Sequence, residues 1–253
     1  MALHAAKLLG FDDYVPPYAL GGRISFGGQV RNYQNTVSQL VQLLGSEDKA
    51  ANYLSRCIYS IGQGSNNYLN NYFMPLFYTT SRHYNPEQYA IVLMQEYDCN
   101  IRLSCLSLFG MAPFSTLYNC GARKFASTGV GHIGCSPNEL GQRSTDGMTC
   151  GERINSANRM FNARLKSMVD QFNDELADAR FGATNAGRCG VGRNNGQITC
   201  LPLQTPCLNR NEYLFWDAFH PGEAANAIIG RRSYKAESPS DAYPFDIQTF
   251  AQI

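Results

Sequence analysis

Apolar positions between residues 37 and 61 predict two short helices followed by a buried strand. Four apolar residues recur at helical spacing before Gly45, a common C-terminal cap: Val37, Leu40, Val41 and Leu44. Ser46, followed by two acidic residues, begins a second predicted helix that runs to about Leu54. The compact apolar run Cys57–Ile61 then predicts a strand that leads into a loop of Gly, Ser and Asn residues. Binding and catalytic residues commonly follow such strands.

The remainder of the chain repeats this alternation. Helices are predicted from about Pro86 to Glu96 and from Pro221 to about Arg232, and a strand is predicted at Lys124–Val130. The strongest helical pattern lies between Glu152 and Leu176, where apolar residues recur at steps of three and four: Ile154, Ala157, Met160, Phe161, Leu165, Met168, Val169, Phe172 and Leu176. The alternation predicts an α/β fold in which helices pack on a parallel sheet, with residues 1–253 forming a single domain.

Composition and charge exclude several classes of partner. The 253 residues are 44% hydrophobic and 16% charged, as is typical of a globular domain. The formal net charge is +1 with the two signs interspersed, so no basic surface for nucleic acid is expected. No apolar run approaches the roughly 20 residues of a membrane-spanning helix. We therefore expect no nucleic-acid partner and no membrane span, and no obligate protein partner is evident.

The cysteines and the N-terminus point to different compartments. Nine cysteines favour an oxidising environment, whereas Met1–Gly10 lacks the apolar run and cleavage site of a secretory signal peptide, which favours the cytoplasm. Cys135 and Cys150 would form a disulfide in the first case and remain thiols in the second. No Cys-x-x-Cys pattern occurs, so we predict no metal site, and no motif indicates a cofactor.

An aspartate and a histidine lie three residues apart immediately before the last predicted helix. They are Asp217 and His220, in the segment 215–222. A serine hydrolase needs a histidine that takes the hydroxyl proton and a carboxylate that fixes the tautomer of that histidine. The same spacing also suits a helix cap beside a hydrogen-bonded loop histidine, so the pair alone leaves both interpretations open.

The pair is part of a larger pattern that resembles a known family. Asp-x-x-His-Pro before the final helix, together with Gly-x-Asn at residues 64–66, is similar to the SGNH hydrolases and specifically to the plant GDSL esterase/lipases. Longer stretches resemble the same family: 8–14, 57–61, 68–75, 121–125, 134–140, 194–200 and 209–213. The resemblance implies a three-layer α/β/α fold with a central parallel sheet, and hydrolysis of carboxylic esters or lipids by serine acyl transfer.

Three site residues follow from this resemblance, position by position. His220 is the expected base, Asp217 the acid that orients it, and the Asn66 side chain a donor to the oxyanion. An amide donor so placed contributes about 3–4 kcal/mol to catalysis. An asparagine in a Gly-rich loop equally often satisfies turn backbone, which is the alternative for Asn66. The family has Asp where this chain has Asn67, a change expected to loosen a supporting hydrogen bond.

The chain departs from the family pattern in several segments. The family's nucleophile lies in a Gly-Asp-Ser motif, and these 253 residues contain none. We therefore expect an N-terminal truncation that removes the nucleophile, and a gap after Ala19 that removes a second oxyanion donor. Residues 97–115 do not resemble the family, and a strand and helix are expected to be missing after Phe181, leaving an unpaired sheet edge. Complete members of the family are typically secreted, whereas this chain shows no signal for secretion.

Three hypotheses about function remain open from the sequence. The first is an ester hydrolase whose activity is small because the nucleophile is missing. The second is a catalytically inactive protein that binds lipid or a partner. The third is a truncated or alternatively spliced product that does not fold stably.

Overall fold

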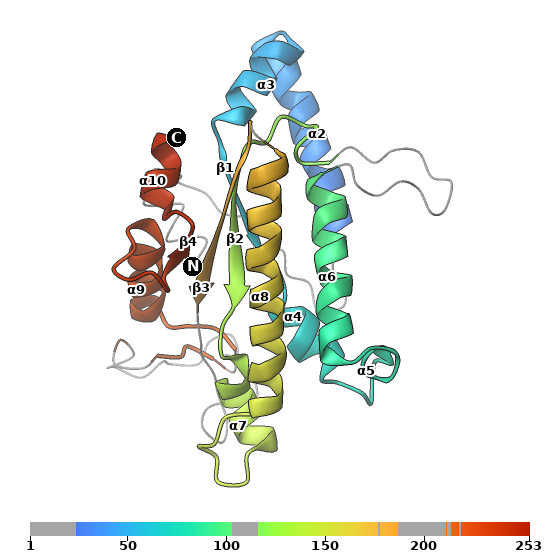
Figure 1. Ribbon diagram of the computed structural model, residues 1–253, viewed down its shortest axis with the longest axis vertical. Helices are drawn as coiled ribbons and strands as arrows, with labels where there is room; N and C mark the ends of the chain where they lie inside the picture. Colours follow the sequence, from blue (N-terminus) through green and yellow to red (C-terminus); the bar gives the residue numbers. More distant parts are fainter. Residues whose placement is uncertain (1–23, 103–115, 177, 187–210, 212–213, 218) are drawn as a thin grey trace, which may run out of the picture.

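A computed structural model describes residues 24–102, 116–176, 178–186, 211, 214–217 and 219–253 of the protein (Figure 1). Its first half contains the following elements in chain order: α2 (Phe26–Leu44), α3 (Glu47–Ser55), β1 (Ile58–Gly62), α4 (Ser65–Asn67), the π-helix η1 (Tyr68–Tyr72), α5 (Thr80–His83) and α6 (Pro86–Ile101). The second half contains β2 (Lys124–Val130), the 3₁₀ turn η2 (Ile133–Cys135), α7 (Pro137–Arg143), α8 (Glu152–Glu175), β3 (Arg180–Ala186), α9 (Glu223–Tyr234), β4 (Ala242–Tyr243) and α10 (Ile247–Gln252).

The described strands form one sheet in the order β1-β2-β3-β4. β1 and β3 both run parallel to β2, so that Ile58 and Arg180 lie on either side of Lys124. The short β4 pairs antiparallel with β3, with Ala242 opposite Thr184. A parallel strand needs cover on both faces, and β2 accordingly has mostly buried side chains. The predicted α/β fold with a parallel sheet is confirmed.

Helices cover the sheet in layers. In Figure 1, α8 runs along the front of the strands with α6 beside it, and α9 and α10 lie at the side of β3 and β4. The long helix α8 contacts α6, β2 and β3, because one side of it is lined by buried apolar residues such as Phe161 and Leu165. Most of the charged residues of α8 are exposed, whereas Asn155 and Asn158 are buried with the apolar residues.

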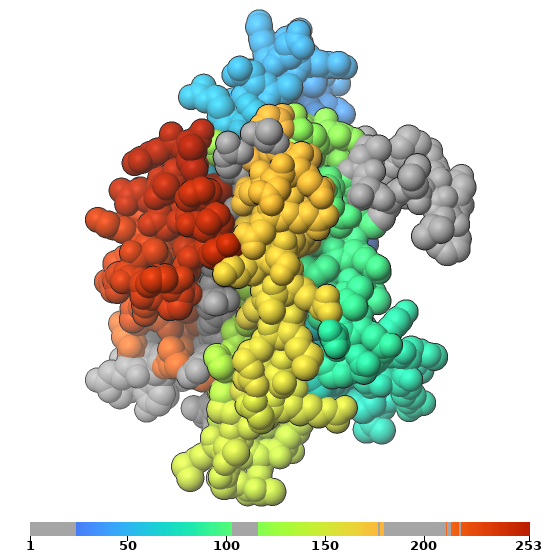
Figure 2. Space-filling model, in the orientation of Figure 1, coloured from blue at the N-terminus to red at the C-terminus, as the bar shows by residue number. Residues whose placement is uncertain are grey.

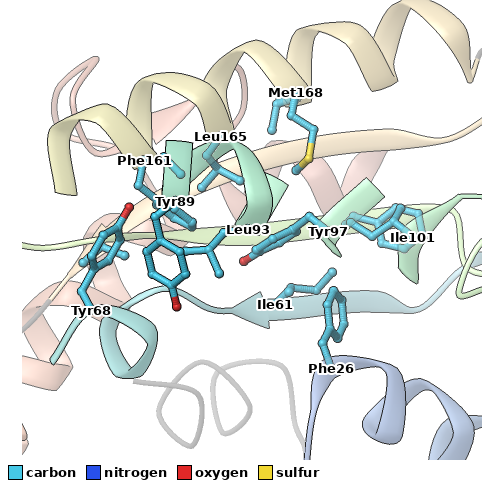
Figure 3. Packing of buried hydrophobic residues seen from close by; sticks show 14 of the residues in the cluster. Phe26, Ile61, Tyr68, Tyr89, Leu93, Tyr97, Ile101, Phe161, Leu165 and Met168 are labelled. Atoms are coloured by element: carbon cyan, nitrogen blue, oxygen red, sulfur yellow. The ribbon is translucent and has the colours of Figure 1, made fainter. Parts of the chain in front are cut away.

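The core is unusually aromatic at the end of β1. Tyr68 is fully buried, and its ring contacts those of Tyr72, Phe73, Tyr89 and Phe161 at centroid distances of 5.6–6.1 Å. Figure 3 shows Tyr68, Tyr89 and Tyr97 between the strands and α8. Edge-to-face ring pairs add to the stabilisation from burial, by about 0.5–1.5 kcal/mol each. This cluster anchors the loop that follows β1.

Several element boundaries differ from the prediction. α2 begins at Phe26, eleven residues before the first apolar position used to predict it, because Ser25 caps the helix by accepting a hydrogen bond from the Gly28 N–H. α6 continues to Ile101, beyond the predicted end at Glu96. α9 begins at Glu223 rather than Pro221.

The backbone of Arg180–Ala186 forms β3 and pairs over its whole length with β2. On the far side of β3, β4 pairs with Ala183 and Thr184. The strand and helix expected to be missing after Phe181 stay a prediction.

Cys135 and Cys150 form a disulfide. It joins η2 to the segment before α8, so of the two states left open for these cysteines the structure has the disulfide. Across the described ranges, no helix combines the length and the apolar character needed to cross a membrane.

Candidate active site

Asp217 and His220 face each other directly. Both carboxylate oxygens of Asp217 lie 2.8 Å from Nδ1 of His220. Asp217 is buried, at 6% exposure, whereas the His220 side chain is 52% exposed. An imidazole whose Nδ1 donates to a buried carboxylate presents Nε2 as the proton acceptor, which is the tautomer needed by a general base.

A short hairpin fixes the geometry of this pair. Phe215 and Pro221 form an antiparallel bridge, and the Trp216 N–H donates to the His220 carbonyl at 2.9 Å. Inside the turn, the backbone N–H groups of Phe219 and His220 donate to Oδ1 of Asp217 at 2.8 and 2.9 Å. The carboxylate is therefore held by the backbone of the same turn that carries the histidine.

The start of α9 secures the other end of the hairpin. Asn226 donates from its side chain to the Pro221 carbonyl at 3.0 Å and from its backbone to the Gly222 carbonyl at 2.9 Å. The position of His220 is therefore coupled to the helix through Pro221, the residue that follows it. Such support limits the movement of the imidazole.

Hydrogen bonds decide the charge states of the pair. Burial acts to raise the pKa of Asp217, but the hydrogen bonds from the His220 side chain and from the backbone N–H groups outweigh it, so the pKa lies below its ordinary value. The hydrogen bond to Asp217 raises the pKa of His220, against the opposing effect of burial. Asp217 is thus ionised at neutral pH, and His220 is a stronger base than a free imidazole.

Asn66 lies in the tight turn that follows β1. The turn depends on Gly64, whose φ of +115° is a conformation that other residues rarely adopt. A Cβ at Gly64 would lie 2.3 Å from a methyl group of Val130 and 3.1 Å from the Phe161 ring. The close approach of this turn to β2 and α8 therefore requires glycine.

The side chain of Asn66 is exposed and oriented by a neighbour. Its Oδ1 accepts a hydrogen bond of 2.9 Å from Nδ2 of Asn70. This bond fixes which end of the carboxamide is the amide, and the Asn66 NH₂ has no acceptor among the described residues. An oriented amide donor of this kind can bind an anionic oxygen.

Both segments lie at the same end of the molecule. β1, β2 and β3 run parallel, so their carboxyl ends share one edge of the sheet, where ligands of open α/β sheets commonly bind. In Figure 1, α4 and the orange segment before α9 both lie at this lower end. The expected site residues are thus on the edge where such a site is usually built, with Asp217 and His220 in contact and Asn66 on a separate loop.

The sequence did not reveal three asparagines of α8 that support this edge. Asn162 binds both the N–H and the carbonyl of Val130, at 2.8 and 2.7 Å, Asn158 donates to the Gly131 carbonyl at 3.0 Å, and Asn155 accepts from the Gly134 N–H at 2.9 Å. Their spacing of three and four places them on one side of the helix. Only this spacing could have indicated that they hold the loop after β2.

Comparison with known proteins places the chain in a family. The sequence profile of the GDSL-like Lipase/Acylhydrolase family matches residues 4–233. The chain belongs to this family.

Similar proteins bear esterase/lipase names. The chain is 53% identical to "GDSL esterase/lipase At5g45670" of Arabidopsis thaliana, over 98% of the chain and 78% of the relative. It is 52% identical to "GDSL esterase/lipase At4g18970" and to "GDSL esterase/lipase At1g29670" of the same organism, with the same coverage. The predicted membership in the GDSL esterase/lipases is confirmed.

The described residues of this GDSL family member were also compared with the arrangements that bind metal ions. No group of three or more His, Cys, Asp or Glu side chains is arranged there to hold a metal ion.

Proposed function

We propose that the protein acts on carboxylic esters, with lipid esters as its substrate class, and that His220 is the general base oriented by Asp217. The observation that carries the proposal is the pair of 2.8 Å contacts between the buried carboxylate and Nδ1 of an exposed imidazole. A cap or packing role would not require the imidazole to project into solvent while its inner nitrogen is held by an ionised group. The esterase/lipase names of the relatives support the same class of reaction.

The proposed reaction transfers the acyl group of the ester to a hydroxyl nucleophile, and water then attacks the acyl group and releases the carboxylic acid. Nε2 of His220 takes the hydroxyl proton as the oxygen attacks the ester carbonyl, and later returns a proton to the leaving alcohol. Asp217 stabilises the imidazolium formed between these steps. Asn66, in the role proposed for it, donates its amide hydrogen to the carbonyl oxygen as that oxygen becomes negative, an interaction of about 3–4 kcal/mol in comparable sites.

The 253 residues contain no Gly-Asp-Ser, so the nucleophile of the family is not assigned to any of their serines. Loss of a nucleophilic serine lowers turnover by about 10⁶ in a serine protease. We therefore expect the 253-residue chain to hydrolyse esters slowly, with His220 taking the proton of an attacking water molecule in place of the hydroxyl. The missing motif also favours a second candidate function, namely binding of lipid esters without turnover.

We also propose that the protein resides in an oxidising compartment. The Cys135–Cys150 disulfide supports an oxidising environment, since thiols of cytosolic proteins are kept reduced.

The experiment is hydrolysis of nitrophenyl acetate and nitrophenyl butyrate by the purified chain, His220→Ala, Asp217→Asn and the matched control His83→Ala. The proposal expects weak turnover that His220→Ala abolishes, that Asp217→Asn reduces, and that His83→Ala leaves unchanged. Equal rates in the chain and in His220→Ala would refute the role of the base. A cooperative melt with no turnover would favour the second candidate function. The absence of a cooperative melt would contradict both candidate functions.

A further inference from the structure

An apolar tip projects from the loop between η1 and α6. It consists of Leu76, Phe77, Tyr78 and Tyr84, which are 90%, 74%, 37% and 40% exposed. Two adjacent large apolar residues with so little cover are uncommon on the surface of a globular protein, where such groups usually mark an interaction site. Figure 2 shows the surrounding segment, coloured teal, protruding from the lower side of the molecule.

Hydrogen bonds of the backbone and of side chains hold the apolar tip in its exposed conformation. The N–H groups of Phe77 and Tyr78 both donate to the Met74 carbonyl at 3.0 Å, which closes a compact turn. The Thr80 hydroxyl donates to the side chain of Asn71 at 2.5 Å. Because these bonds hold the turn, Leu76 and Phe77 cannot fold back onto the core without breaking them.

Buried groups anchor both ends of the loop. The hydroxyl of Tyr72, which is 1% exposed, donates to the Tyr84 carbonyl at 3.0 Å. Arg143 of α7 donates to the Phe73 carbonyl at 2.6 Å. The tip is therefore presented on a support that is continuous with the aromatic core.

The segment that forms the apolar tip carries one formal positive charge. Residues 74–85 contain Arg82 and His83 and no carboxylate. Arg82 is exposed and donates to the Pro75 carbonyl at 3.1 Å, and no described carboxylate pairs with it. The guanidinium thus lies directly beside the apolar residues with its charge uncompensated, an arrangement suited to an anionic surface.

We propose that the apolar tip docks on a lipid–water interface that carries anionic headgroups. Leu76 and Phe77 would enter the acyl region, the two tyrosines would lie at the headgroups as aromatic residues do in membrane proteins, and Arg82 would contact phosphate. A protein partner fits less well, because stable interfaces use about 20–30 residues on each side and the tip offers four apolar side chains.

The location of the tip bears on the substrate of the proposed function. The choice of a lipid surface as the docking partner rests on that function. In Figure 1, α5 lies at the lower right beside α4, and the segment that carries His220 lies in the lower half on the opposite side. Docking by the tip would place the lipid surface next to the half of the molecule that holds the carboxyl edge of the sheet. The substrate class is then an ester within a lipid assembly rather than one dissolved in water.

Vesicle co-sedimentation tests the proposal without any turnover. The probes are vesicles of phosphatidylcholine and vesicles of phosphatidylcholine with phosphatidylserine. The proteins are the full chain, Leu76→Ser/Phe77→Ser, Arg82→Gln, and the control Leu43→Ser, which changes a residue 80% exposed on α2. Circular dichroism checks that each variant melts like the parent chain.

We expect the chain to bind the anionic vesicles, the double variant to bind about tenfold more weakly or less, and Arg82→Gln to lose about fivefold on anionic vesicles only. Leu43→Ser should bind like the parent chain. The proposal is overturned if the parent chain does not bind, if the double variant binds equally well, or if Leu43→Ser loses as much. Concentration-dependent dimerisation that the double variant abolishes would also overturn it, by showing that a second copy covers the tip. Binding without ester hydrolysis would support this inference while contradicting the proposed reaction.

Discussion

Replacing Gly64 by alanine should destabilise the protein strongly, because the turn that carries Asn66 has neither the backbone conformation nor the space for a Cβ. A φ of +115° in a residue other than glycine costs about 1–3 kcal/mol. The added Cβ would also lie 2.3 Å from Cγ2 of Val130. Val130 cannot easily move away, since Asn162 holds its N–H and its carbonyl and a valine side chain has few rotamers. Overpacking of this kind adds about 1–3 kcal/mol, for a total of about 2–6 kcal/mol.

Two glycines of the same chain separate these contributions. At Gly62, the last residue of β1, a Cβ would meet no atom within 4 Å, so Gly62→Ala should change the free energy of unfolding by less than about 1 kcal/mol. Gly45 has a φ of +81° and equally open surroundings, so Gly45→Ala should cost only the backbone contribution, about 1–2 kcal/mol. Urea unfolding of the three variants measures the series. Equal costs for Gly64→Ala and Gly45→Ala would refute the packing argument, and a neutral Gly64→Ala would refute both parts.

Three further predictions concern groups around the same edge of the sheet. Asn155→Ala removes the acceptor of the buried Gly134 N–H and should lower the free energy of unfolding in urea by about 1–3 kcal/mol. The control Asn35→Ala, at an exposed position of α2, should cost far less. Similar losses in the two variants would contradict the supporting role of Asn155. Reduction of the Cys135–Cys150 disulfide, which closes a loop with a sequence separation of 15, should lower stability by about 3 kcal/mol, and a melting temperature that does not respond to reductant would contradict this. Burial raises the pKa of the Glu139 carboxyl, against the effect of Arg143. The folded state therefore holds the carboxyl proton more tightly than the unfolded state does. The contribution of Glu139 to stability consequently falls as pH rises from about 4.5 through the folded pKa. The stability of Glu139→Gln relative to the parent chain should therefore improve over that pH window. Parallel pH curves for Glu139→Gln and the parent chain would argue against the prediction.

Elements with strong periodicity could be predicted from the sequence, and those that depend on tertiary contacts could not. The helix predicted between Glu152 and Leu176 is found as α8, yet Met160 of its apolar series is 40% exposed. The asparagines between the apolar residues carry the contacts to β2, which a search for apolar positions does not consider. The start of α2 was missed because Gly27 and Gly28 follow Phe26 and weaken the helical pattern there.

The sequence indicated residues for the candidate site but not their geometry. Spacing and family resemblance indicated Asp217 and His220, but an interval of three residues does not determine that both carboxylate oxygens face Nδ1. That arrangement depends on the bridge between Phe215 and Pro221, which pairs residues across a turn. The bond from Asn70 that orients Asn66 depends on the helical turn between these residues and was likewise not indicated by the motif.

The most direct measurement of the central claim, that Asp217 prepares His220 as a base, is an NMR titration of the His220 imidazole in the parent chain and in Asp217→Asn. The hydrogen bond to the carboxylate raises the pKa of His220, so the imidazole of the parent chain should titrate above the ordinary value for histidine, and that of Asp217→Asn should titrate at lower pH. An imidazole that titrates at the same pH in both proteins would contradict the claim, because Asp217 would then have no influence on the proton that His220 has to carry.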